Sequence, residues 1–129
     1  MPVVANTEAR EVPWRPGYRN FVLAGDDAGL ACVVGYSELQ PGAGAPLHVH
    51  DGVDEIFIGL QGKLDIRLGD ERFVVEPEHT IAIPGGVPHS FVAVGPEPVR
   101  MYTFMPQHHA IAEATTYLEG EVPPGAADH

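Results

Sequence analysis

The stretch HVHDGVDEIFIGLQG, residues 48–62, sets two histidines two positions apart, a glutamate five residues after the second, and a glycine seven residues beyond that. Alternate side chains of an extended strand point to the same face, so His48 and His50 project together. The aspartate–glycine pair that follows favours a turn, after which an antiparallel strand beginning at Glu55 can return its carboxylate to the same side. The stretch therefore predicts two β-strands that carry three convergent metal-ligating side chains.

Glycines and prolines recur at short intervals on both sides of this stretch and divide the chain into runs too short for most helices. In KLDIRL, residues 63–68, apolar and polar side chains alternate, which predicts a strand with one buried and one hydrated face. The same reasoning predicts strands over 19–24, 30–39, 46–50, 55–60, 63–68, 71–76, 80–84, 89–94 and 99–105. Such a regular succession of short strands and turns indicates an all-β sandwich or barrel.

The pattern changes in the last part of the chain. Apolar side chains recur there at helical spacing: Ile111, Ala114, Tyr117 and Leu118. We therefore predict a helix over 107–119 and, because 120–129 offers little to bury, a tail after it. The barrel core is expected over about 30–106, and residues 1–129 form one domain, since a chain of 129 residues suffices for one hydrophobic core.

Composition excludes several classes of function. The formal net charge is −11 with seven lysines and arginines, so the chain would repel a nucleic-acid backbone. No apolar run is long enough to span a bilayer, and we expect no membrane partner. The first twenty residues lack the basic start and apolar core of a secretory signal, which predicts a cytoplasmic protein.

A third histidine, His89, follows the turn PGGVP at 84–88 and begins a predicted strand. If that strand lies beside the first pair, His89 completes a set of three imidazoles and one carboxylate, which are ligands suited to a divalent transition metal.

These residues resemble the two sequence motifs of the cupin superfamily, G-x5-H-x-H-x4-E-x6-G and G-x5-P-x-G-x2-H-x3-N. Every named position of the first motif is matched, by Gly42, His48, His50, Glu55 and Gly62. The second motif is matched by Pro84, Gly86 and His89. Glu78 and Ala93 stand where this motif has its opening glycine and its asparagine, which affects the local turn and the strand end rather than the ligands.

The resemblance implies a double-stranded β-helix, a jelly-roll barrel to which the predicted C-terminal helix is attached. It also implies that His48, His50, Glu55 and His89 bind one divalent transition metal inside the barrel. The sequence does not choose among Fe, Mn, Ni, Co, Cu and Zn. Glu55 is in addition the one candidate catalytic residue, as a base released from the metal, although the role of ligand is favoured.

Four protein ligands leave two adjacent positions on the metal for water, dioxygen or a small chelating substrate. The favoured interpretation is a metal-dependent enzyme, most simply a dioxygenase, that acts on a small oxygenated organic molecule. The first alternative is a redox-neutral Lewis-acid enzyme: an isomerase, a decarboxylase or a cyclase of the cupin polyketide type, which the chain also resembles. The second is a cupin that binds a small ligand without changing it.

Pocket walls are expected from residues two positions after the ligands. Phe57 shares a strand face with Glu55, and Phe91 shares one with His89. The strand 99–105 presents either Tyr102 and Phe104 inward or its other face with Met101, Thr103 and Met105, and the sequence does not decide between them. The aromatic pair is kept as the candidate lining.

Aromatic side chains near the N-terminus suggest a homodimer. Trp14, Tyr18 and Phe21 need burial that a small barrel does not readily provide alone. Of the remaining histidines, His79 is expected in an exposed turn, and the role of His108 and His109 is left open.

Overall fold

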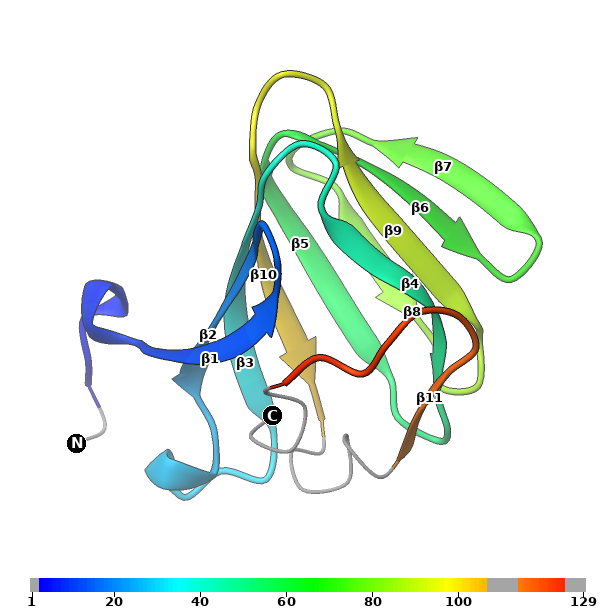
Figure 1. The fold of residues 1–129 in the computed structure, drawn as a ribbon. Helices are drawn as coiled ribbons and strands as arrows, with labels where there is room; N and C mark the ends of the chain where they lie inside the picture. The colour runs from blue at the N-terminus through cyan, green and yellow to red at the C-terminus, as the bar shows by residue number, and fades with distance from the viewer. Residues whose placement is uncertain (1–2, 107–113, 125–129) are drawn as a thin grey trace.

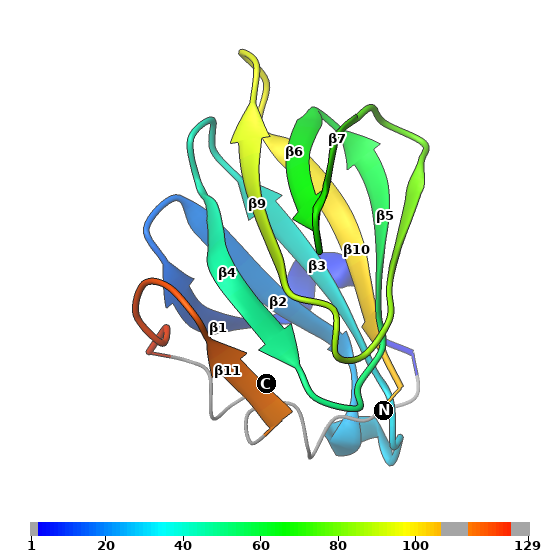
Figure 2. The same ribbon diagram turned by 90° about the vertical axis from the view of Figure 1, so that its right-hand side faces the viewer.

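The computed structural model describes residues 3–106 and 114–124. Two antiparallel sheets lie face to face and enclose the core (Figures 1 and 2). The six-stranded sheet has the order β1 (Arg10–Arg15), β2 (Tyr18–Ala24), β3 (Val33–Leu39), β10 (Val99–Met105), β5 (Glu55–Gln61) and β8 (Thr80–Ile83). The five-stranded sheet has the order β11 (Thr115–Tyr117), β4 (Gly44–His50), β9 (His89–Val94), β6 (Lys63–Leu68) and β7 (Glu71–Val75).

The described residues contain two short 3-10 helices, η1 (Asn6–Glu8) and η2 (Asp26–Ala28), and one further helical residue, Ala114. Within this part of the chain, no helix has the length and apolar character that crossing a membrane requires. The predicted all-β jelly-roll fold is therefore confirmed.

Each strand predicted from the sequence is present, and the largest shift is at the start of β3, which was expected at residue 30 and begins at Val33. The alternation in β6 behaves as expected, because Leu64 and Ile66 are buried whereas Lys63 and Arg67 are exposed. Inward-facing apolar side chains from both sheets make one core cluster, in which Leu39, Phe57, Ile66 and Met101 are almost fully buried. Burial of such a side chain contributes about 1.5–3 kcal/mol to folding.

The helix predicted over 107–119 is wrong from Thr115 onwards, whereas Ala114 just before it is helical. Residues 107–113, including His108 and His109, lie outside the described residues. Thr115–Tyr117 form β11, which pairs antiparallel with β4 through Thr115 opposite His50 and Tyr117 opposite His48. Two β-branched residues and an aromatic one suit a strand, and the outer edge of β4 supplies the backbone partners that outweigh the helical spacing.

The two strands of the opening stretch do not pair with each other as expected. β4 belongs to the five-stranded sheet and β5 to the six-stranded sheet, so the turn between them crosses from one sheet to the other. β9 does lie beside β4, with His48 directly opposite His89. Glu55 consequently reaches the histidines across the interior rather than along one sheet.

Of the three aromatic residues that suggested a homodimer, Tyr18 is buried within one chain, and Trp14 and Phe21 are half-buried. Tyr18 is buried in the core, and the Trp14 ring meets it edge-on at a centroid distance of 6.3 Å. Trp14 lies on β1 and Tyr18 on β2. The strand β1 was not predicted from the sequence, because Pro13 interrupts its alternating pattern. The homodimer stays a prediction, which light scattering on the purified protein can test.

Two turn positions show how the motif residues act. Gly62 has φ +77°, and a Cβ placed there would lie 2.5 Å from the carbonyl oxygen of Pro98, so only glycine fits. Glu78, which stands where the second motif has glycine, nevertheless adopts φ +63°. The turn is thus retained although the residue that usually permits it has been replaced.

Candidate metal centre

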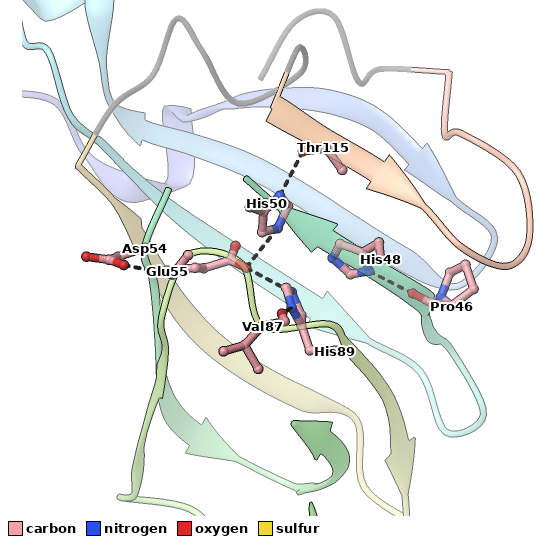
Figure 3. Close-up of polar contacts among 9 residues, drawn as sticks. Pro46, His48, His50, Asp54, Glu55, Val87, His89 and Thr115 are labelled. Carbon is pink, nitrogen blue, oxygen red and sulfur yellow. Dashed lines mark hydrogen bonds and ion pairs between the residues drawn. The ribbon is translucent and has the colours of Figure 1, made fainter. Parts of the chain in front are cut away.

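Three buried histidines meet on the inner face of the five-stranded sheet. His48 and His50 are two residues apart on β4, and His89 begins the neighbouring strand β9. One ring nitrogen from each lies within 4.8 Å of the others (Figure 3). Strand alternation and the register of β4 with β9 therefore bring together the three residues that the sequence singled out.

The facing sheet supplies the carboxylate. Glu55 Oε1 lies 3.3 Å from His50 Nε2 and 3.5 Å from His89 Nε2 (Figure 3). The loops that lead to these side chains are tied together, since Gly86 N–H donates to the His50 carbonyl and Gly85 N–H donates to Asp54 Oδ1, each at 2.8 Å. These two hydrogen bonds attach the loop between β4 and β5 to the turn that precedes β9.

Hydrogen bonds at Nδ1 determine which nitrogen His48 and His89 offer. His48 Nδ1–H donates to the Pro46 carbonyl at 2.7 Å, and His89 Nδ1–H donates to the Val87 carbonyl at 3.0 Å. A carbonyl oxygen only accepts, so in the neutral rings Nε2 carries the free lone pair. The Nδ1 atom of His50 lies 2.7 Å from Thr115 Oγ1, which anchors the third ring to β11.

The Nε2 atoms of His50 and His89 fit a metal ion. Both are buried and have no hydrogen-bond partner among the described residues. Ligand atoms at about 2.1 Å from one metal, set at right angles, lie roughly 3 Å apart, close to the observed separation from Glu55. A set of imidazole nitrogens and one carboxylate oxygen suits a divalent transition metal.

Electrostatics support the protonation states that a metal requires. Burial raises the pKa of the Glu55 carboxyl, but the contacts with His50 and His89 outweigh this effect and bring the pKa down to about 2. Burial, followed by the nearby His89, lowers the pKa of His48 to about 4. At neutral pH the centre therefore holds an anionic glutamate beside a neutral His48.

Three of the four candidate ligands, His48, His50 and Glu55, line a cavity between the two sheets, whereas His89 is fully buried and is not among the lining residues. Phe57 and Phe91, the expected pocket walls, line this cavity with ring centroids 5.2 Å apart. Tyr102 and Phe104 do not; Thr103 and Met105 line the cavity from the opposite face of β10. The prediction of an aromatic lining from β10 is wrong. On the outer face of the sheet, Tyr102 lies opposite Tyr36, and their ring centroids are 6.1 Å apart.

Several cavity residues were not identified from the sequence. Tyr117 on β11 covers His48, with ring centroids 5.3 Å apart, and Thr115 lines the cavity beside His50. From β2, Tyr18 and Asn20 line the facing wall. The alternation of YRNFV already sets Tyr18 and Asn20 on one face, but the sequence lacked a signal that this face turns inward towards the histidines.

The cavity is mainly apolar. Among the described residues that line it, Glu55 is the only acidic side chain and there is no lysine or arginine. A ligand with several negative charges would find no organic cation to neutralise it here.

Comparison with known proteins identifies the family. Residues 35–105 match the family model described as the cupin domain. The chain belongs to the cupin family. Among curated proteins, this cupin is 41% identical over 46 residues to quercetin 2,3-dioxygenase of Bacillus subtilis (strain 168). The match covers 36% of the chain and 14% of that enzyme, well under two thirds of its length.

Solved structures share the fold of this cupin over most of its length. The polyketide cyclase RemF from Streptomyces resistomycificus superposes with a TM-score of 0.77 and 21% identity, covering 99% of this chain and 91% of the cyclase. A predicted oxalate decarboxylase from Thermotoga maritima gives 0.74 and 18%, covering 82% and 99% of the two chains. At these identities the likeness shows the fold alone.

Proposed function

We propose that this cupin is a metal-dependent enzyme acting on a small oxygenated molecule that chelates the metal, and that its reaction is a dioxygenation. One observation carries the proposal: three buried imidazoles and one carboxylate converge beside a mainly apolar cavity, which His48, His50 and Glu55 line. Unpartnered ring nitrogens in such a place would be costly unless they had a ligand.

His48, His50, Glu55 and His89 would hold the metal, whose identity among Fe, Mn, Ni, Co, Cu and Zn is open. When bound, a redox-active metal supplies positions at which substrate and dioxygen react side by side. Glu55 contributes the negative charge that partly offsets the metal. Glu55 Oε1 lies 3.3 Å and 3.5 Å from the Nε2 atoms of His50 and His89, so we assign Glu55 the role of ligand rather than of proton acceptor.

The cavity walls favour one kind of substrate. Phe57 and Phe91 present an apolar surface beside the ligands and exclude water from it. A divalent metal with one glutamate carries a net charge of one, which suits a neutral or singly deprotonated chelator better than a dicarboxylate. Hydroxyketones on an aromatic ring meet this description, and the names quercetin dioxygenase and polyketide cyclase agree with it.

A redox-neutral cyclase is the second candidate. The observation that favours it is the match to the polyketide cyclase RemF, which covers 99% of this chain and so includes the parts outside the cupin motifs. In that case the metal acts as a Lewis acid, and the same residues bind and orient the substrate.

Oxygen consumption separates the candidates. Protein purified without a histidine tag is analysed for bound metal, and flavonol is then added to the loaded enzyme in a sealed oxygen electrode. We expect stoichiometric metal, uptake of dioxygen and loss of the flavonol chromophore. Turnover that persists without dioxygen would replace the dioxygenase with the redox-neutral alternative. Binding without any product would indicate a ligand-binding cupin, and a chain that takes up no added metal would overturn all metal-dependent functions.

A further inference from the structure

We propose that the inner face of the six-stranded sheet carries a second subsite, in which Asn20, Tyr18 and Thr103 hydrogen-bond an uncharged oxygen of the substrate. This inference rests on the proposed function and deepens it, because it defines the end of the substrate that does not chelate the metal. All three side chains line the cavity into which His48, His50 and Glu55 also project. They come from the sheet that faces the histidines.

Asn20 is a polar side chain at a position where an apolar one is expected. It lies between the buried positions Tyr18 and Val22 on the inner face of β2 and is only 4% exposed. Its neighbour across the strand pair is Ser37, which is fully buried and whose hydroxyl donates to Asn20 Oδ1 at 2.6 Å. This bond fixes the orientation of the amide, whose oxygen accepts from the protein and whose nitrogen is a hydrogen-bond donor.

Tyr18 adds a neutral acceptor to the same wall, because the one proton of Ser37 goes to Asn20 and the bond between Tyr18 and Ser37 therefore uses the phenol proton. Burial, followed by the charge of Glu55, raises the pKa of its hydroxyl, and a hydrogen bond with Ser37 offsets only part of the increase. The phenol therefore remains protonated at physiological pH. Tyr18 and Asn20 are thus linked through Ser37, which orients both without facing the cavity itself.

The third member depends on a glycine. Gly35 lies between Val22 and Thr103 in the sheet register, and a Cβ placed on it would be 2.6 Å from Thr103 Oγ1. The missing side chain leaves the space in which the threonine hydroxyl sits. Gly35 and Thr103 both line the cavity, so this part of the wall combines a hollow with a hydroxyl group.

The chemistry of the wall defines what it would recognise. An amide, a phenol and an aliphatic hydroxyl bind a carbonyl or hydroxyl oxygen, and among the described lining residues no lysine or arginine is present to bind an anion. Phe57 and Phe91 provide apolar surface within the same cavity. The substrate therefore has a flat apolar body, a chelating pair of oxygens at one end and an uncharged oxygen at the other.

A matched pair of ligands tests this subsite on the metal-loaded, full-length protein. Flavonol carries the chelating hydroxyketone alone, and its derivative with one hydroxyl on the distal phenyl ring adds the uncharged oxygen. We expect that hydroxyl to tighten binding to the wild type about tenfold by calorimetry. Asn20→Leu and Thr103→Val should each remove most of the gain while leaving flavonol affinity and metal content unchanged. Asn6→Leu, an exposed site on η1, is the matched control.

The possible outcomes separate the subsite from the proposed function. A hydroxyl that brings no gain in the wild type, or a variant that weakens both ligands equally, would overturn the subsite. So would a metal-loaded protein that binds neither flavonol, although metal binding itself would then stand. If the wild-type protein takes up no added metal, the proposed function is overturned, and with it the subsite that rests on that function. The Thr103 variant, which keeps the side-chain shape, preserves the test if Asn20→Leu does not fold.

Discussion

The two sheets meet along two seams that differ in construction. At the stitched seam, the guanidinium of Arg15 on β1 donates to the carbonyl of Glu121 at 2.5 Å and lies over the ring of Tyr117, 5.1 Å from its centre. The segment that follows β11 thus runs back towards β1 (Figure 1). At the open seam, β7 and β8 are sheet edges, and between them lies an apolar groove in which Phe73 and Val74 are 45% and 61% exposed.

The difference shows what the candidate centre requires of the fold. Three candidate ligands come from one sheet and Glu55 comes from the other, so their spacing depends on the distance between the sheets. The stitched seam holds that distance through β11, which contacts His50 and His48 directly. The groove of the open seam is lined by none of the candidate ligands. Variants on the two seams should accordingly have unequal effects on metal binding.

The largest effect is expected from a ligand itself. His89→Ala removes one imidazole from the set of four donors and should lower metal affinity at least a hundredfold, measured by elemental analysis after dialysis against a weak chelator. His79→Ala removes a histidine from the groove of the open seam and should leave metal content unchanged. Equal metal loss in the two variants would remove the distinction between the seams.

A smaller effect is expected at the strand that covers the histidines. Thr115→Val keeps the shape of the side chain but removes the hydroxyl beside His50 Nδ1, so we expect about a tenfold loss of metal affinity. Thr116→Val changes the adjacent, exposed residue of β11 in the same way and serves as the control. Competition with a fluorescent chelator measures both. An unchanged affinity in Thr115→Val would mean that β11 covers the site without orienting it.

The next prediction concerns the contacts that Arg15 makes at the stitched seam. Arg15→Gln removes the cation over Tyr117 and weakens the bond to Glu121, which should destabilise β11 locally by about 1 kcal/mol. Amide hydrogen exchange in residues 114–119 should become several times faster, with little change in the core strands. Arg10→Gln, at the exposed start of β1, is the control. Uniformly faster exchange throughout the chain would instead indicate a global loss of stability.

The smallest effect belongs to the turn beside the open seam. Glu78 has φ +63°, a conformation that glycine adopts without the cost that a side chain imposes. Glu78→Gly should raise the free energy of unfolding by about 0.5 kcal/mol, because relief of strain slightly exceeds the added entropy of the unfolded chain. The same change at Glu97, which is not among the residues with positive φ, should lower it by a similar amount. Chemical denaturation measures the two differences, and metal affinity should not change in either variant.

Local pattern was sufficient for the strands in the middle of the chain and insufficient at the stitched seam. Alternation and turn residues located β2 to β10, because most of these strands have one face towards the core and a glycine or proline near their ends; β7, four of whose five residues are exposed, was located by its turns. The two strands that were missed, β1 and β11, are both members of the stitched seam. Pro13 interrupts the strand pattern of β1, and the spacing of Tyr117 and Leu118 is typical of a helix. Each is a strand because an edge is available to pair with, and that edge exists only in the folded protein.

The candidate ligands were predictable for a different reason. His48, His50, Glu55 and His89 occupy fixed spacings in two motifs, so the resemblance to those motifs located them from the amino-acid sequence alone. Which face of β10 turns inward was not predictable, because Met101 and Met105 are no more apolar than Tyr102 and Phe104. Sheet register decided that question, by placing Thr103 opposite the inward-facing Gly35.

The contact between His50 and Thr115 also has a consequence for biosynthesis. Sixty-five positions separate the two residues, and β11 follows all four candidate ligands along the chain. Until β11 has been made and has paired, the outer edge of β4 and the Nδ1 atom of His50 lack the partners that this strand supplies. A chain cut before β11 would therefore keep every candidate ligand and lose the contact that anchors one of them.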